Sequence, residues 1–246
     1  MLIAKSSHPV NVRAISFPRF ERRFYLSAAS LFLVLVFGTF ARPYYLRLLF
    51  DSPPLPRLIH IHGIVMTGWV VLLVVQTTLV AIHRVQWHRR LGVVGAGWAV
   101  LVVILGATTT LSAAAREVRA HSHFAAIQVT VTGLELVQML LFAALVTTAI
   151  VLRRRTDVHK RLMLLTIACM LPSAVGRLPF DFIDNFIILL SLDVFVVACV
   201  CIDTLRHHRL HPAFAWGAAL VLGGLHLAFH VAMGPWWHSV GTKLVS

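Results

Sequence analysis

Residues Phe124–Leu152 read FAAIQVTVTGLELVQMLLFAALVTTAIVL, and the basic run Arg153–Arg155 follows directly. Glu135 is the only charged side chain in this stretch. A helix of this length rises about 44 Å, which is more than the roughly 30 Å of hydrocarbon in a bilayer. Apolar and polar residues do not alternate in Leu140–Leu152, as they would in a strand of a membrane barrel. The stretch therefore predicts a membrane-spanning α-helix.

The composition of the whole chain points to the same environment. Of the 246 residues, 59% are hydrophobic and only 13% are charged, and the mean hydropathy is +0.84. Because about a quarter of the residues in a water-soluble domain are charged, this chain has too little polar surface for a globule in water. Lipid offers no hydrogen bonds to the backbone, so spans must be helices or a closed barrel. We therefore expect an all-α membrane helix bundle.

Apolar runs of roughly 20 residues predict seven transmembrane helices. The runs are Phe24–Ala41, Ile59–Ile82, Leu91–Ala115, Phe124–Leu152, Leu162–Phe180, Phe182–Ile202 and Ala213–Met233. The fifth and sixth are almost continuous, so a re-entrant hairpin is the alternative for this pair. The predicted organisation is a cytoplasmic segment 1–23, a transmembrane domain 24–233 and an external tail 234–246.

The net charge of +13 lies in short basic clusters between the apolar runs. Fifteen Lys and Arg residues fall on one predicted side of the membrane and seven on the other. The positive-inside rule then places the N-terminus in the cytoplasm and the C-terminus outside. Such clusters contact anionic lipid head groups, and no soluble basic module is left to bind nucleic acid. We expect a multi-pass protein of the bacterial plasma (inner) membrane.

The chain has 14 histidines, which the predicted topology divides between the two membrane faces. An imidazole in the membrane is costly unless it is hydrogen-bonded or binds a metal. Neutral imidazole suits zinc, copper or haem iron. Alternatively, histidines at the interface hydrogen-bond to head groups and water. The candidate metal ligands on the outer side are His60, His62, His121, His123, His226 and His230.

Two acidic residues, Glu135 and Asp193, fall near the middle of predicted spans. An ionisable group at that depth is by default a functional hypothesis. It suggests a proton relay, or a site for a cation or a quinone head group. The alternative is a protonated carboxyl group that is hydrogen-bonded to a neighbouring helix. Asp181 and Asp184, at the outer end of the fifth and sixth spans, are candidate oxygen ligands.

Short polar motifs mark the helix ends between residues 60 and 177. They are His62-Gly63, Gln76, His88-Arg89-Arg90-Leu91-Gly92, His159-Lys160-Arg161-Leu162-Met163 and Arg177-Leu178-Pro179. This pattern covers about half the chain and resembles a family of bacterial membrane proteins known as domain of unknown function 2306. The resemblance implies no particular activity. It does imply that the matching residues are functional. We take them as candidate cofactor-binding residues: His62, Gln76, His88, His159 and Arg177.

Histidines near both faces of a helical bundle are also similar in plan to the cytochrome b561 group, whose members pass electrons between haem groups. We therefore expect haem b or a transition metal, and a role in electron transfer or metal handling with a respiratory or redox partner. The His226-x-x-x-His230 pair looks like that of the seven-helix zinc hydrolases related to alkaline ceramidase. A zinc-dependent lipid hydrolase is the alternative, and a structural or transport protein without metal is the third class.

Overall fold

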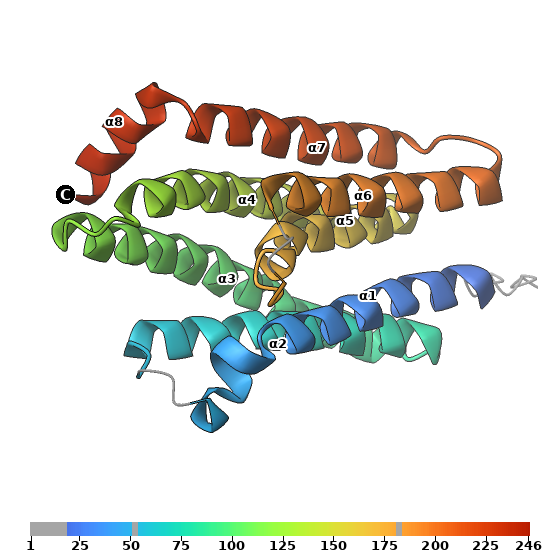
Figure 1. Cartoon of the computed structure of the whole chain (residues 1–246). Coiled ribbons are helices and arrows are strands. Elements are labelled where there is room, and N and C mark those ends of the chain that lie inside the picture. The colour runs from blue at the N-terminus through green and yellow to red at the C-terminus, as the bar shows by residue number, and fades with distance from the viewer. Residues whose placement is uncertain (1–18, 51–53, 181–183) are drawn as a thin grey trace, which may run out of the picture.

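The computed structural model describes residues 19–50, 54–180 and 184–246, which form a helical bundle without strands (Figure 1). A π-helical turn η1 (Ala41–Tyr45) and a 3-10 turn η2 (Arg47–Leu49) follow the first helix. The helices are α1 (Arg19–Thr39), α2 (Arg57–Ala81), α3 (Val85–Arg119), α4 (Ala125–Val151), α5 (Thr156–Val175), α6 (Asn185–His207), α7 (Pro212–Ala232) and α8 (Pro235–Val245). The predicted all-α class is confirmed.

Six of these helices, α2 to α7, are long and apolar enough to cross a membrane. A chain with six such helices is a multi-pass integral membrane protein. Figure 1 shows α1 to α7 running back and forth along one axis. Helix α1 overlaps the first predicted span, Phe24–Ala41, but begins five residues earlier and ends two residues earlier. That α1 crosses the membrane stays a prediction. The total of seven spans, and the membrane side on which each chain end lies, therefore stay predictions as well.

The observed helix boundaries differ from the predicted ones where polar residues continue a helix. Helix α4 (Ala125–Val151) matches the predicted Phe124–Leu152 to within one residue at each end. Helix α3 (Val85–Arg119) begins six residues before, and ends four residues after, the predicted Leu91–Ala115. Hydropathy locates only the part of a helix that lies in hydrocarbon. Its charged ends, whose long side chains reach the head groups, remain helical.

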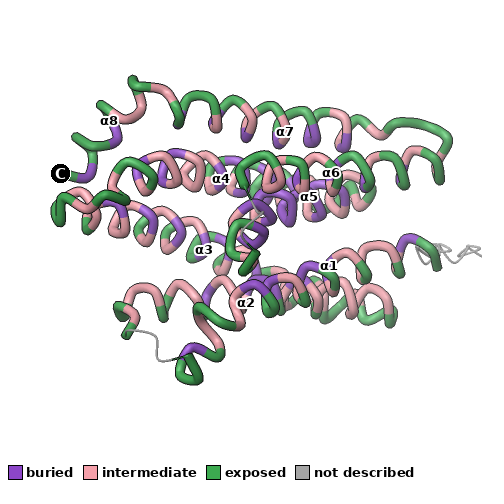
Figure 2. The backbone as a smooth tube through the Cα atoms, in the orientation of Figure 1, coloured by how far each residue is buried: buried purple, intermediate pink, exposed green. Residues whose placement is uncertain are grey.

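Helix α5 lies at the centre of the bundle. It packs against α1, α4, α6 and α7, and Figure 2 shows buried residues concentrated on it. In the apolar stretch of α5, 67% of the residues are buried, compared with 17% in the apolar stretch of α6. Helix α5 therefore forms the core, and α6 lies at the periphery. Both helices are long enough to span a bilayer. Part of their connection, residues 181–183 with the candidate ligand Asp181, lies outside the described residues.

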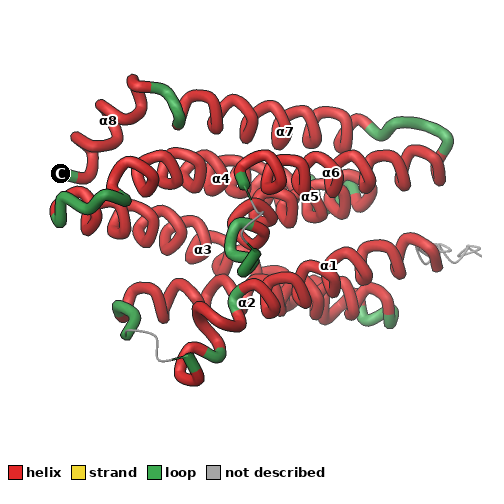
Figure 3. Tube along the Cα trace, viewed as in Figure 1, coloured by secondary structure: helices red, strands yellow, loops and turns green. Residues whose placement is uncertain are grey.

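The predicted external tail 234–246 contains helix α8, which crosses the ends of α3 and α4. Short connections join α3 to α4 and α7 to α8 (Figure 3). Nε1 of Trp237 donates to the carbonyl oxygen of Val129 at 2.8 Å. A Cβ atom on Gly133 would lie 2.7 Å from the Trp237 ring, so only glycine admits this indole. Of the predicted N-terminal segment 1–23, residues 1–18 lie outside the described part of the chain.

Candidate functional site

Two of the predicted site histidines lie next to each other although they belong to different helices. The rings of His88 on α3 and His159 on α5 have centroids 6.3 Å apart and planes at 76°. Nδ1 of His159 donates to the carbonyl oxygen of Ala149 at 2.8 Å. Because this hydrogen bond fixes the proton on Nδ1, Nε2 of the neutral ring carries a lone pair. His159 therefore has one nitrogen able to accept a proton or bind a metal.

Gln76 on α2 completes this group, which we call the inner cluster (Gln76, His88 and His159). In the amide orientation that satisfies its neighbours, the oxygen accepts from the Gly92 amide at 3.0 Å and the nitrogen donates to Nδ1 of His88 at 2.5 Å. Nδ1 of His88 is then an acceptor, so the neutral ring carries its proton on Nε2. With the amide turned over, Nδ1–H would donate to the Gln76 oxygen, and Nε2 would have the lone pair.

A second group, the outer cluster, consists of His62 on α2, Glu135 on α4 and Arg177, which follows α5. Nη2 of Arg177 lies 3.7 Å from Oε1 of Glu135, and its guanidinium lies over the Phe40 ring at 5.0 Å. His62 interacts electrostatically with both charges. Its Nδ1 is buried and has no hydrogen-bond partner among the described residues. Such a buried polar atom is uncommon and marks the ring as a candidate binding group.

The five residues singled out by the resemblance therefore form two clusters, not one site. His62 and Gln76 are 14 residues apart on α2, close to four helical turns, so they lie on nearly the same face about 21 Å apart. Helix α2 thus presents one polar residue to each cluster at two depths.

The remaining candidate metal ligands are dispersed. Among residues 19–50, 54–180 and 184–246, no three His, Cys, Asp or Glu side chains could hold a metal ion together. His60 lies beside Tyr44, with ring centroids 5.9 Å apart. His121 and His123 are in the α3–α4 connection, and exposed His230 lies near the end of α7. The structure does not bring these histidines together, and metal binding by any of them stays a prediction.

The intramembrane acid Asp193 on α6 pairs with His226 on α7. Nε2 of His226 donates to Oδ1 of Asp193 at 2.9 Å, and the side chains are 40% and 35% exposed, respectively. Asp184, a candidate oxygen ligand, caps the start of α6, because its Oδ1 accepts from the Ile187 amide at 2.9 Å.

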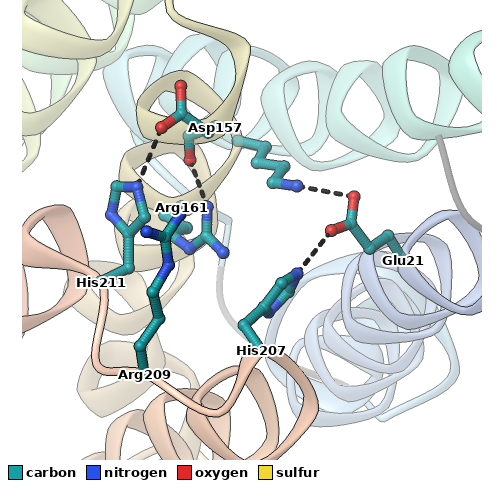
Figure 4. A pocket seen from close by; sticks show the side chains of 7 residues that line it. Glu21, Asp157, Arg161, His207, Arg209 and His211 are labelled. Carbon is teal, nitrogen blue, oxygen red and sulfur yellow. Dashed lines mark hydrogen bonds and ion pairs between the residues drawn. The ribbon is translucent and has the colours of Figure 1, made fainter. Parts of the chain in front are cut away.

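Polar side chains also join four helices at the predicted cytoplasmic end of the bundle. Figure 4 shows them converging on one pocket. The pocket has a volume of about 150 Å³ and is lined by Glu21, Asp157, Lys160, Arg161, His207, Arg209 and His211. We call these residues, together with Asp203, the rim network.

The buried centre of the rim network is a two-point ion pair. Nε and Nη2 of Arg161 on α5 donate to the two carboxylate oxygens of Asp203 on α6, at 2.9 and 2.8 Å. These side chains are 3% and 5% exposed. Nη1 of Arg161 also donates to the carbonyl oxygen of Asp157 at 2.8 Å. Two parallel charge-assisted hydrogen bonds fix the orientation of α5 against α6.

Glu21 attaches α1 to this centre, just before the first apolar run. Nζ of Lys160 donates to its Oε2 at 2.6 Å, and Nε2 of His207 donates to its Oε1 at 2.9 Å. Burial alone would raise the pKa of Glu21. The hydrogen bonds and charges of Lys160 and His207 outweigh burial and lower this pKa below its ordinary value. The carboxylate is thus ionised at neutral pH.

The sequence interpretation missed the acidic members of the rim network, Glu21, Asp157 and Asp203. The basic clusters were predicted to contact lipid head groups, not acidic side chains of the protein. A signal was present, because the chain has only 9 acidic residues and these three lie beside basic clusters. Which cluster each acid meets depends on helix packing, which the sequence does not show.

The fold and its two polar clusters define a multi-pass membrane protein with candidate binding groups at two depths. Comparisons with protein-family models, with curated proteins and with solved structures find no match to this chain. The resemblances to domain of unknown function 2306 and to the cytochrome b561 group stay predictions.

Proposed function

We propose that this protein binds a haem b group between His88 and His159 and supports electron transfer in the plasma membrane of a bacterium. The observation behind the proposal is the 6.3 Å separation of the two ring centroids. A metal bonded to two imidazoles at about 2 Å each would hold the ring centroids roughly 6 Å apart. The two histidines belong to different helices, α3 and α5, so the rings could hold a metal between these helices.

The surroundings of both rings support this role. Metal-binding histidines usually donate their second ring N–H to a carbonyl oxygen or a similar acceptor. His159 does so to Ala149. His88 would do so only with the Gln76 amide turned over, which would set the amide oxygen against the His88 carbonyl oxygen and the amide nitrogen against the Gly92 N–H. Arg89 and Arg90 follow His88 in the chain and provide positive charge for haem propionates.

A second candidate function is proton transfer within the inner cluster. When the Gln76 amide nitrogen donates to Nδ1 of His88, the neutral His88 ring has a donor at Nε2, whereas His159 has an acceptor at Nε2. Two imidazoles in complementary tautomers pass a proton directly or through one water. This function requires no metal, so the same protein preparation distinguishes it from haem binding.

The test is an absorption spectrum of the full chain, purified in detergent from haem-replete cells. We expect a Soret band, an α-band after dithionite reduction, and about one iron per chain for a single haem ligated by two histidines. His88→Ala and His159→Ala should each lose the reduced α-band. His230→Ala, an exposed histidine outside both clusters, is the matched control and should retain it.

A colourless protein that also fails to bind added haemin would refute haem binding. Stoichiometric zinc in such a preparation would favour the lipid hydrolase alternative. A preparation with neither iron nor zinc would leave proton transfer, or a structural or transport role. A spectrum that survives both His88→Ala and His159→Ala would reject the inner cluster as the site.

A further inference from the structure

The pair Asp193–His226 lies on the outside of the bundle. Both side chains are partly exposed, and the main contacts of α6 within the described part of the chain are with α5 and α7. An ion pair that served only to join α6 to α7 would be expected between the two helices. Here both side chains instead keep more than a third of their surface exposed, at the periphery of the bundle.

Both residues of the pair lie well inside helices that are long and apolar enough to span a membrane. Asp193 lies eight residues after the start of α6 at Asn185, about 12 Å along the helix. His226 lies six residues before the end of α7 at Ala232, about 9 Å along the helix. Neither water nor lipid head groups normally reach this depth, where polar groups must be satisfied by the protein or by a ligand.

The pair is only partly satisfied. Nε2 of His226 donates to Oδ1 of Asp193, whereas Nδ1 of the ring and Oδ2 of the carboxylate have no partner among the described residues. Gly223 lies three residues before His226, on the same side of α7, and nothing lies within 4 Å of where its Cβ would be. An exposed aliphatic side chain follows each member of the pair in the chain, Val194 on α6 and Leu227 on α7.

We propose that Asp193 and His226 bind the head group of a lipid-soluble quinone, with Gly223 providing room for the flat ring. A quinone reaches this depth because it dissolves in hydrocarbon, and its tail can remain in the lipid beside Val194 and Leu227. A doubly protonated His226 donates from Nδ1–H to a quinone carbonyl oxygen. A neutral His226, with its proton on Nε2, accepts at Nδ1 from a quinol hydroxyl group. The carboxylate–imidazole pair thus suits both forms of the ligand.

This site is separate from the inner cluster, so the inference does not depend on haem binding. The experiment uses the full chain in phosphatidylcholine nanodiscs, titrated with a benzoquinone carrying a ten-carbon tail, with binding followed by calorimetry. We expect saturable binding, at least about tenfold weaker for His226→Leu, since the ring that hydrogen-bonds to the head group is lost, and for Gly223→Leu, since the space is filled.

Gly97→Leu on α3 is the matched control, because Gly97 is also exposed with nothing within 4 Å of its Cβ position. It should bind the quinone as the wild type does. Absence of saturable binding to the wild type, or equal affinity in Gly223→Leu and the wild type, would overturn the proposal. So would a wild-type dimer that His226→Leu converts to a monomer without any quinone effect, because the pair would then join two copies of the chain.

Discussion

Asp193 and Asp203 lie ten residues apart on α6, yet the two carboxylates have opposite surroundings. Asp203 is buried and receives two hydrogen bonds from Arg161, whereas Asp193 is partly exposed and receives one from His226. A charge in surroundings of low polarity is tolerated when its hydrogen-bonding capacity is filled. The Asp203 pair is therefore complete and holds the fold together, whereas the Asp193 pair has capacity left for a ligand.

The largest effect should come from Asp203→Ala, which leaves the Arg161 guanidinium buried without its partner. We expect a loss of about 3–5 kcal/mol in the free energy of unfolding, the usual cost of breaking one side of a buried pair. Thermal unfolding of the detergent-purified protein measures it. Asp193→Ala is the matched control, with an expected loss of about 1 kcal/mol because it removes a single hydrogen bond at the periphery of the bundle.

Replacing both partners provides the complementary test. Arg161→Met combined with Asp203→Leu removes the unpaired charge and should recover most of the stability lost in Asp203→Ala. If Asp193→Ala were as destabilising as Asp203→Ala, the contrast between a structural pair and a binding pair would be wrong.

A smaller effect should distinguish two glycines on different sides of α7. A Cβ atom on Gly217 would lie 2.5 Å from Cδ1 of Leu165, a fully buried core residue, whereas Gly223 has open space. Gly217→Leu should therefore cost about 1–3 kcal/mol through overpacking. Gly223→Leu should leave the melting temperature almost unchanged. A comparable loss in both variants would mean that the Gly223 side of α7 is covered, which also removes the room for a quinone ring.

The sequence was sufficient to locate the helices but not to predict which helices pack side by side. Apolar length located α4 almost to the residue, because the apolar run ends directly at the basic residues Arg153–Arg155. The repeated basic motifs placed His88 and His159 among the candidate residues, and the structure brings them together. The pairing of Asp193 with His226 depends on which helices pack side by side, which hydropathy does not encode. The same gap explains why the outer histidines were expected together and are dispersed.

The smallest effect should be the acid sensitivity that Glu21 gives to the rim network. Its folded pKa lies below its ordinary value of 4.5, because Lys160 and His207 outweigh the opposing effect of burial. The ionised carboxylate therefore stabilises the fold above the unfolded pKa, and this contribution disappears as the pH falls through the folded pKa. Glu21→Gln should lower the free energy of unfolding at pH 7 by about 1 kcal/mol. It should also flatten the fall in melting temperature below pH 4.5.

Glu117→Gln, at the far end of α3, is the matched control for this measurement, since Glu117 lies outside the rim network. It should keep the acid profile of the wild type. If Glu21→Gln also kept that profile, Glu21 would not attach α1 through its charge, and the rim network would reduce to the Arg161–Asp203 pair. The contrast on α6 would then still stand, because it rests on whether each carboxylate has all its hydrogen bonds and not on how many charges gather at the rim.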